Sequence, residues 1–126
     1  MTRRVTEVAL PTPLSLPAGI TEGPYGNIWF TAQRAGTIGV IDLPSRRVAE
    51  LPVPTPLANP IGITAGPDGG VWFAELTGNR IGRADPATRT IREIPLPTPL
   101  AAPVGITPGP DGNVWFVELL ANAVGR

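Results

Sequence analysis

The chain has 126 residues and a mass of 13.2 kDa, the size of one ordinary domain, and 42% of its residues are apolar. Its ten basic and ten acidic residues balance and are scattered along the sequence, which argues against nucleic acid or an anionic membrane as a partner. The sequence has no cysteine, which excludes a disulfide scaffold and a thiolate metal site.

The N-terminal stretch MTRRVTEVALPTPLSLPAG carries two arginines, but no uninterrupted apolar run follows them. Pro11, Pro13 and Pro17 divide this stretch, so we expect no signal peptide. No other segment approaches the roughly 20 apolar residues of a membrane helix. We therefore expect a soluble chain, and its cellular location stays open.

The sequence repeats itself. Trp29, Trp72 and Trp115 align without a gap at a period of 43 residues. In this alignment RRVTEVALPTPL lies over RRVAELPVPTPL and RTIREIPLPTPL, and TIGVID lies over RIGRAD and AVGR. A period in the forties with about four strand-like runs is typical of propeller blades. The sequence therefore predicts an all-β fold, a β-propeller, in which the single domain 1–126 holds the repeats 3–45, 46–88 and 89–126.

Each repeat is expected to form one antiparallel sheet of four strands. From the centre of the propeller outward, the strands carry the GIT sequence, the WF pair, the IG pair and an alternating charged and aliphatic segment. The first residues, 5–10, match a fourth strand whose first three strands are missing. In chain order the expected strands are 5–10, 19–21, 27–31, 37–42, 48–53, 62–64, 70–74, 80–85, 91–96, 105–107, 113–117 and 123–126.

The strand with the WF pair is apolar on both faces, as expected for a sheet that lies between two neighbouring blades. Its aromatic side chains are therefore predicted to form the core: Trp29, Phe30, Trp72, Phe73, Trp115 and Phe116. A turn of the GPDG type precedes this strand and requires glycine at positive φ, at Gly26, Gly69 and Gly112. Pro52 and Pro95 in the fourth strand indicate the sheet edge.

The register of the two ends leaves strands without partners. The sequence opens on the fourth strand 5–10 and closes on a third strand. Three blades do not easily close a ring, and the apolar faces of the end blades would be exposed. We therefore expect a homodimer that forms a six-bladed ring, in which strand 5–10 of each chain completes the last blade of the other. A homotrimer with nine blades obeys the same pairing, but propellers usually have four to eight.

The segment GITAGPDGGVWFAELTGNRIGRADPATRTIREIPLPTP, residues 62–99, resembles a blade of the streptogramin B lyases, also called virginiamycin B lyases. The resemblance covers essentially the whole chain. It implies a propeller fold, which in that family has seven blades. It also implies an enzyme that opens a cyclic depsipeptide antibiotic by elimination, with histidine and glutamate around a magnesium ion. Because seven is not a multiple of three, the resemblance suggests a natural or engineered part of a propeller.

The resemblance does not carry the catalytic groups with it. The chain has no histidine, and the elimination requires a positioned base and acid. Glu75 and Glu118 match the acidic position after the WF pair, but the first repeat has Ala32 there. We expect no catalytic residue, no cofactor and no enzyme activity. Glu75 and Glu118 are candidate metal or ligand residues at the channel mouth, against the simpler interpretation of salt bridges with Arg80 or hydrogen bonds to loop amides.

Three functions are compatible with these features. The first is a non-catalytic module whose partner is a second copy of itself and which closes into a ring. The second is a propeller that binds a small molecule, a sugar or a cation. The third is a degenerate protein of the lyase type.

Overall fold

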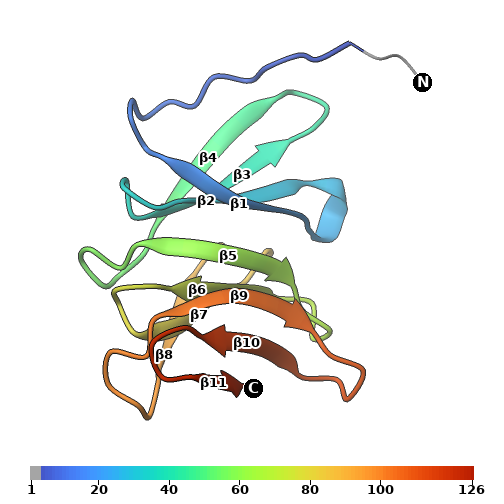
Figure 1. Ribbon diagram of the computed structural model, residues 1–126. Coiled ribbons are helices and arrows are strands. Elements are labelled where there is room, and N and C mark those ends of the chain that lie inside the picture. The colour runs from blue at the N-terminus through green and yellow to red at the C-terminus, as the bar shows by residue number, and fades with distance from the viewer. Residues whose placement is uncertain (1–3) are drawn as a thin grey trace.

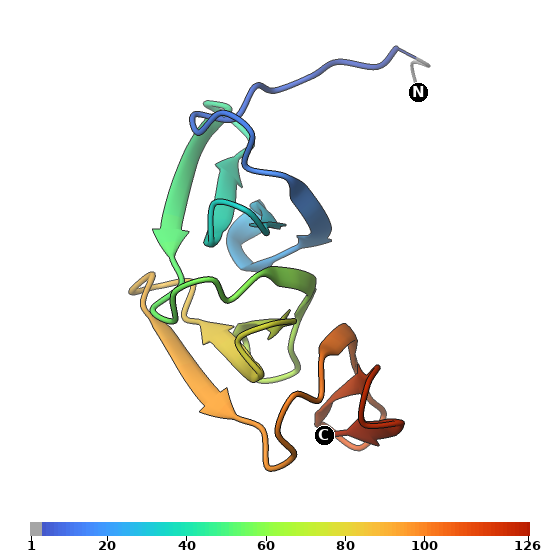
Figure 2. The same ribbon diagram turned by 60° about the vertical axis from the view of Figure 1, so that its left-hand side comes forward.

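The computed structural model describes residues 4–126 and contains three antiparallel sheets that follow one another along an arc (Figures 1 and 2). The strand orders are β1-β2-β3-β4, β5-β6-β7-β8 and β9-β10-β11, and we call these sheets blades 1, 2 and 3. The prediction of antiparallel propeller blades is confirmed, with four strands in blades 1 and 2 and three in blade 3. In the described part of the chain, no helix is long and apolar enough to cross a bilayer. The strands are β1 Pro17–Glu22, β2 Ile28–Ala32, β3 Thr37–Asp42, β4 Arg47–Pro52, β5 Pro60–Ala65, β6 Val71–Glu75, β7 Arg80–Ala84, β8 Ile91–Pro95, β9 Pro103–Pro108, β10 Val114–Glu118 and β11 Ala123–Gly125.

The phenylalanine of the second strand and the glycine of the third strand form a pair in every blade. Phe73 in β6 stands opposite Gly82 in β7, and a Cβ atom on Gly82 would lie 2.1 Å from the Phe73 Cζ. The same arrangement pairs Phe30 with Gly39 and Phe116 with Gly125. The glycine of the IG pair therefore leaves room for the phenylalanine ring that stands opposite it on the neighbouring strand.

Neighbouring blades touch most closely at their innermost strands. A Cβ atom on Gly19 in β1 would lie 2.3 Å from the Ile61 carbonyl oxygen in β5. A Cβ atom on Gly62 in β5 would lie 2.1 Å from the Val104 carbonyl oxygen in β9. These distances are far below van der Waals contact, so only glycine permits the approach. Within residues 4–126, a Cβ atom on Gly105 in β9 would meet only the Val117 Cγ2, at 3.7 Å.

The core lies between the blades. Trp29, Ile38 and Val40 of blade 1 pack against Val71 and Phe73 of blade 2 in one buried cluster. A smaller cluster joins blade 2 to blade 3 and consists of Ala74, Ile81 and Phe116, with Trp72, Leu96 and Ile106 packed against it. Adjacent sheets therefore bury the apolar faces that they turn towards each other, as expected for repeat units.

The N-terminal segment does not form the strand that the sequence predicts at 5–10. Its residues adopt no regular structure, and Val5 is exposed. In both views the segment runs away from blade 1, at the opposite end of the arc from β11 (Figures 1 and 2). The reason is geometric, because β4 already fills the outer position of blade 1, and the free edge of β11 is out of reach within the chain.

The second and third blades share a polar arrangement at the GPDG turn. The Trp72 Nε1 donates to the Asp68 Oδ1 at 3.0 Å, and Arg83 forms an ion pair with Asp68 at 2.9 Å. The Arg83 guanidinium also lies over the Trp72 ring, 5.8 Å from its centroid. In blade 3 the corresponding residues are Trp115, Asp111 and Arg126, with the same contacts.

Blade 1 lacks this arrangement. Tyr25 replaces the aspartate and Val40 replaces the arginine. Trp29 is 1% exposed, and its Nε1 has no hydrogen-bond partner within residues 4–126. Tyr25 itself is exposed and has a φ of 64°, which is uncommon for an aromatic residue. The first blade therefore carries an unsatisfied buried donor.

We predict that Tyr25→Asp stabilises the protein by about 1 kcal/mol, because a carboxylate at this position accepts a hydrogen bond from the Trp29 Nε1. Aspartate also tolerates a positive φ better than tyrosine does. The measurement is thermal or urea unfolding followed by tryptophan fluorescence. Tyr25→Ala is the matched control, since it removes the ring without adding an acceptor. Equal stability of the two variants contradicts the prediction.

Candidate functional site

Glu75 is the last residue of β6 and the most completely buried charged side chain in the described part of the chain. It is 0% exposed. Its position in the strand places it on the same face of the sheet as Phe73, the face that packs against blade 1. Gly78 in the following turn lies against it, because a Cβ atom there would be 2.7 Å from the Glu75 Oε1. The strand, the turn and the neighbouring blade together exclude water from this carboxyl group.

Glu93 in β8 approaches Glu75 across the sheet. Strand register places Arg80 opposite Glu75, and Gly82 opposite Glu93, so all these residues share one face. Among residues 4–126 no N–H or hydroxyl group donates to either Glu75 oxygen or to the Glu93 Oε2. Glu93 lies close enough to raise the pKa of Glu75, so a proton on one of the two carboxyl groups would let them share a hydrogen bond.

Burial and, to a lesser extent, the neighbouring carboxyl group of Glu93 together raise the pKa of Glu75 to about 8, against a smaller opposite effect of Arg80. The expected salt bridge with Arg80 is wrong, as is the expected bonding to loop amides. The Arg80 guanidinium instead donates to the Gly78 carbonyl oxygen at 3.0 Å. Glu75 therefore retains its proton at neutral pH, beside the carboxyl group of Glu93.

The equivalent positions in the other blades differ. Glu118 ends β10 and is also buried, so neither glutamate is an exposed carboxylate at a channel mouth. Among residues 4–126, blade 3 has three strands, and Glu118 has no counterpart of Glu93 beside it. In blade 1 Ala32 replaces the glutamate, and Glu50 accepts a hydrogen bond from the Thr12 hydroxyl at 2.8 Å. Only blade 2 has both carboxyl groups.

A cation site at Glu75 and Glu118 stays a prediction. Within the described residues, no three side chains of the aspartate, glutamate, histidine or cysteine type gather as metal ligands. Glu75 and Glu118 are the last residues of equivalent strands in blades 2 and 3. Each is buried in its own blade, so the two do not lie in one shared site. The chemistry that this position supports directly is binding and release of a proton by Glu75, whose pKa is raised to about 8.

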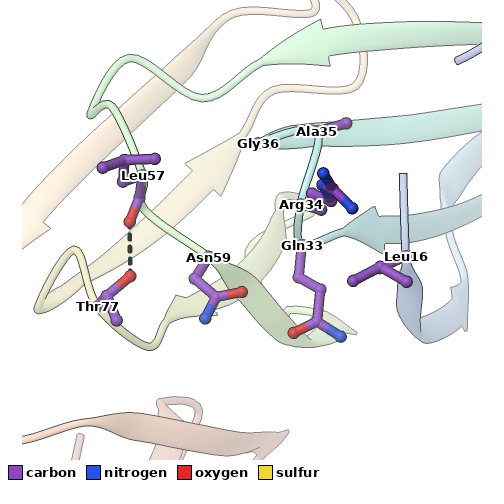
Figure 3. A pocket seen from close by; sticks show the side chains of 8 residues that line it. All are labelled: Leu16, Gln33, Arg34, Ala35, Gly36, Leu57, Asn59 and Thr77. Carbon is purple, nitrogen blue, oxygen red and sulfur yellow. Dashed lines mark hydrogen bonds between the residues drawn. The ribbon is translucent and has the colours of Figure 1, made fainter. Parts of the chain in front are cut away.

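A cleft of about 540 Å³ lies between the loops of blades 1 and 2 (Figure 3). Its walls come from the β2–β3 turn, the connection from β4 to β5, the β6–β7 turn and the start of β1. The Thr77 hydroxyl donates to the Leu57 carbonyl oxygen at 2.5 Å and ties two of these loops together. The residues that line the cleft are Leu16, Gln33, Arg34, Ala35, Gly36, Leu57, Asn59 and Thr77.

The residues predicted to be structural lie as follows. Trp29, Phe30, Phe73 and Phe116 are buried, whereas Trp72 and Trp115 are half-buried, with their indole N–H groups bonded to aspartates. The turn glycines Gly26, Gly69 and Gly112 have φ values of 71°, 85° and 81°.

Sequence reasoning treated GPDG as a turn and missed the role of its aspartate. Burial acts to raise the pKa of Asp68, but hydrogen bonds from Trp72, Gly70 and Arg83 lower it overall. Hydrogen bonds from Asn113 and Trp115 hold the pKa of Asp111 well below its ordinary value. An available signal was the joint presence of aspartate and arginine in repeats two and three and their joint absence in the first.

The fold and the repeat define a segment of a β-propeller. The sequence model of the virginiamycin B lyase family matches residues 1–126, and the chain belongs to this family. None of the curated proteins compared with the chain matches it.

The chain is similar to virginiamycin B lyase from Staphylococcus aureus in its selenomethionine form, with 41% identity and a TM-score of 0.93 over 98% of this chain and 41% of that one. A catalytically inactive histidine-to-alanine variant of that enzyme, solved with quinupristin, gives the same values. A second structure, of a streptogramin B lyase, shares 44% identity with a TM-score of 0.87, over 92% of this chain and 38% of that one. The chain thus spans about two-fifths of the length of these enzymes.

We predict that the free energy of unfolding falls as the pH rises from about 4.5 to about 8. In this window the folded state retains the proton on Glu75, whereas the unfolded state has lost it. The slope is at most about 1.4 kcal/mol per pH unit. Glu75→Gln removes this contribution and makes the protein more stable than the parent at pH 8.5.

The measurement is urea unfolding at a series of pH values. Glu22→Gln serves as the control, because Glu22 is exposed on β1 and should leave the slope intact. An unchanged slope in Glu75→Gln contradicts the raised pKa of Glu75.

Proposed function

We propose that the polypeptide of residues 1–126 is a non-catalytic propeller module that closes a ring with a second copy of itself. In this ring, residues 5–10 of each copy form the fourth strand of blade 3 in the other. The observation that carries the proposal is the contrast between buried positions inside the arc and the same positions at its two ends.

The open face of blade 3 repeats a surface that is buried elsewhere. Ile38 in blade 1 is 0% exposed and Ile81 in blade 2 is 5% exposed, because the next blade covers each of them. The equivalent residue in blade 3, Val124, is 63% exposed, and Val117 beside it is 45% exposed. Exposed apolar surface of this kind favours association.

Blade 1 presents the matching surface at the other end. Ile63 in β5 is buried against blade 1, and Ile106 in β9 packs against blade 2. The equivalent Ile20 in β1 is 70% exposed. Each end face therefore has the shape and polarity of one half of an internal blade contact. Two copies placed head to tail can form that contact twice, in a cyclic arrangement.

The unpaired edge of β11 specifies the strand register. In blade 2, β7 pairs with β8 so that Ile81 stands opposite Ile94 and Gly82 opposite Glu93. The repeat maps this pairing onto Val124 opposite Val8, and Gly125 opposite Glu7, of the second copy. Two copies give six blades and three copies give nine, and propellers usually have four to eight, which favours the dimer.

Absence of catalysis is part of the proposal. The solved lyase variant described as catalytically inactive differs at a histidine, and the present chain has no histidine. The carboxyl groups of Glu75 and Glu118 are buried between blades, out of reach of a bulky substrate. General acid–base catalysis requires positioned groups in contact with the substrate.

A second candidate function rests on the cleft between blades 1 and 2. Its volume of about 540 Å³ fits a small ligand, and Arg34, Gln33 and Asn59 supply polar groups on its wall (Figure 3). Ring closure leaves this cleft in place, since both of its blades belong to one chain. Binding of a small molecule is therefore compatible with the first proposal.

The first prediction here is that the polypeptide sediments at twice its 13.2 kDa mass and that Gly105→Ala makes it monomeric. In the closed ring, the Gly105 Cα approaches the carbonyl oxygen of the partner's Ala18, as Gly62 approaches Val104 within the chain. In the single chain, a Cβ on Gly105 meets only the Val117 Cγ2, at 3.7 Å. The variant should therefore fold and fail to dimerise.

Analytical ultracentrifugation and circular dichroism provide the two readouts. Gly62→Ala is the matched variant, because its Cβ clashes inside the chain and should lower the melting temperature. A stable 13.2 kDa monomer of the parent polypeptide, or a dimer that Gly105→Ala leaves intact, overturns the proposal.

We also predict that the polypeptide does not open quinupristin. The assay incubates protein and antibiotic with magnesium and follows ring opening by mass spectrometry, with an active streptogramin B lyase as the positive control. Conversion that rises in proportion to protein concentration, and is lost in Gly62→Ala, contradicts a non-catalytic function.

A further inference from the structure

We propose that Glu118 of one chain and the partner's Glu7 share a proton across the ring junction, so that ring closure responds to pH. This inference rests on the proposed ring with exchanged strands. It adds a regulatory contact to that junction.

The Glu75 and Glu93 pair within blade 2 is the template. Glu75 ends the second strand, and Glu93 stands opposite Gly82 in the outer strand. Glu118 ends the second strand of blade 3 and is already buried in the single chain. Glu7 stands opposite Gly125 once residues 5–10 pair with β11. Glu118 and the partner's Glu7 then have the same offset in register as Glu75 and Glu93 and lie on the same face of the sheet. Their carboxyl groups therefore come together.

Nearby cations balance a second carboxylate charge less well at the junction than in blade 2. In blade 2 the nearby Arg80 favours ionisation of Glu75. The equivalent residue in blade 3 is Ala123, and the β9 neighbour of Glu118 is Pro103, so neither flanking strand supplies a charge beside Glu118. Two carboxylates at this separation repel each other, and a shared proton removes the repulsion.

One cation on blade 2 bears on the junction. Arg92 in β8 lies on the face that points towards blade 3, on the same side as Ile81 and Ile94. It is exposed in the single chain. Asp68 and Arg83 on the same blade pair with each other, and Arg126 pairs with Asp111. Arg92 is therefore the cation that would form an ion pair with the partner's Glu7 in place of the shared proton.

The alternatives predict opposite effects of pH. A shared proton is lost as the pH rises, which weakens the junction. An ion pair of Arg92 with the partner's Glu7 forms as the carboxyl ionises, which strengthens the junction as the pH rises. The buried position of Glu118 and its lack of a neighbouring cation in β9 and β11 favour the shared proton.

The experiment measures the dimer dissociation constant from pH 5 to pH 8.5 by sedimentation, for the parent, Glu7→Gln, Glu118→Gln and the control Glu22→Gln. For the parent and the control we expect a dissociation constant at least about tenfold lower at pH 5 than at pH 8.5. The reason is proton linkage. Where dissociation of the dimer releases one proton, the dissociation constant rises tenfold with each pH unit. Either glutamine variant at the junction should flatten this dependence and dimerise well at pH 8.5.

The outcomes separate the two proposals. A dimer whose dissociation constant does not vary with pH, or a dimer that strengthens as pH rises and weakens in Glu7→Gln, overturns the shared proton and leaves ring closure standing. No dimer at any pH overturns both. If the glutamine variants fail to fold by circular dichroism, Glu7→Thr and Glu118→Met replace them, and an unchanged pH dependence in these variants also overturns the inference.

Discussion

The close approach of neighbouring innermost strands is the contact on which the rest of the structure depends. Gly62 brings its backbone against the Val104 carbonyl oxygen, nearer than any side chain permits. This contact sets the spacing of the blades. The spacing then decides that the WF strand is covered on both sides and that Phe73 must fold over Gly82 within its own sheet. Stability is accordingly shared between blades, as in other repeat proteins, and no blade buries its faces alone.

The same spacing of the blades changes the ionisation of a residue whose sequence context is ordinary. Glu75 is a charged residue at the end of a strand, where solvent would normally reach it. The turn at Gly78 and the face of blade 1 close over it, and the resulting loss of hydration raises its pKa. Blade 1 avoids this cost with Ala32, and its Glu50 bonds to threonine instead. Variation at one repeat position thus converts a neutral contact into one that responds to pH.

The strands and their order could be predicted because they follow from a period of 43 residues and from alternation, both of which are visible in one sequence. The carboxyl pair could not, since Glu75 and Glu93 belong to different strands and become neighbours only through the register across β7. The positive φ of Leu57 was equally hidden, because leucine carries no turn signal and the surrounding connection imposes the conformation. Residues 5–10 matched a strand by sequence and yet form none here, because strand formation needs a free edge within reach.

Membership of the virginiamycin B lyase family describes the scaffold, and the chemistry depends on individual residues. The repeat fixes where side chains from successive blades meet, and it does so equally for a catalytic histidine, a carboxyl pair or an alanine. The Gly62 contact and the aromatic core contain no acid–base group, so the fold does not depend on the residues that would carry catalysis. Blade 2 has both of its neighbours within the chain and holds the complete carboxyl pair. In blade 1 Ala32 replaces the first glutamate of this pair, and within residues 4–126 blade 3 supplies Glu118 without an outer strand beside it.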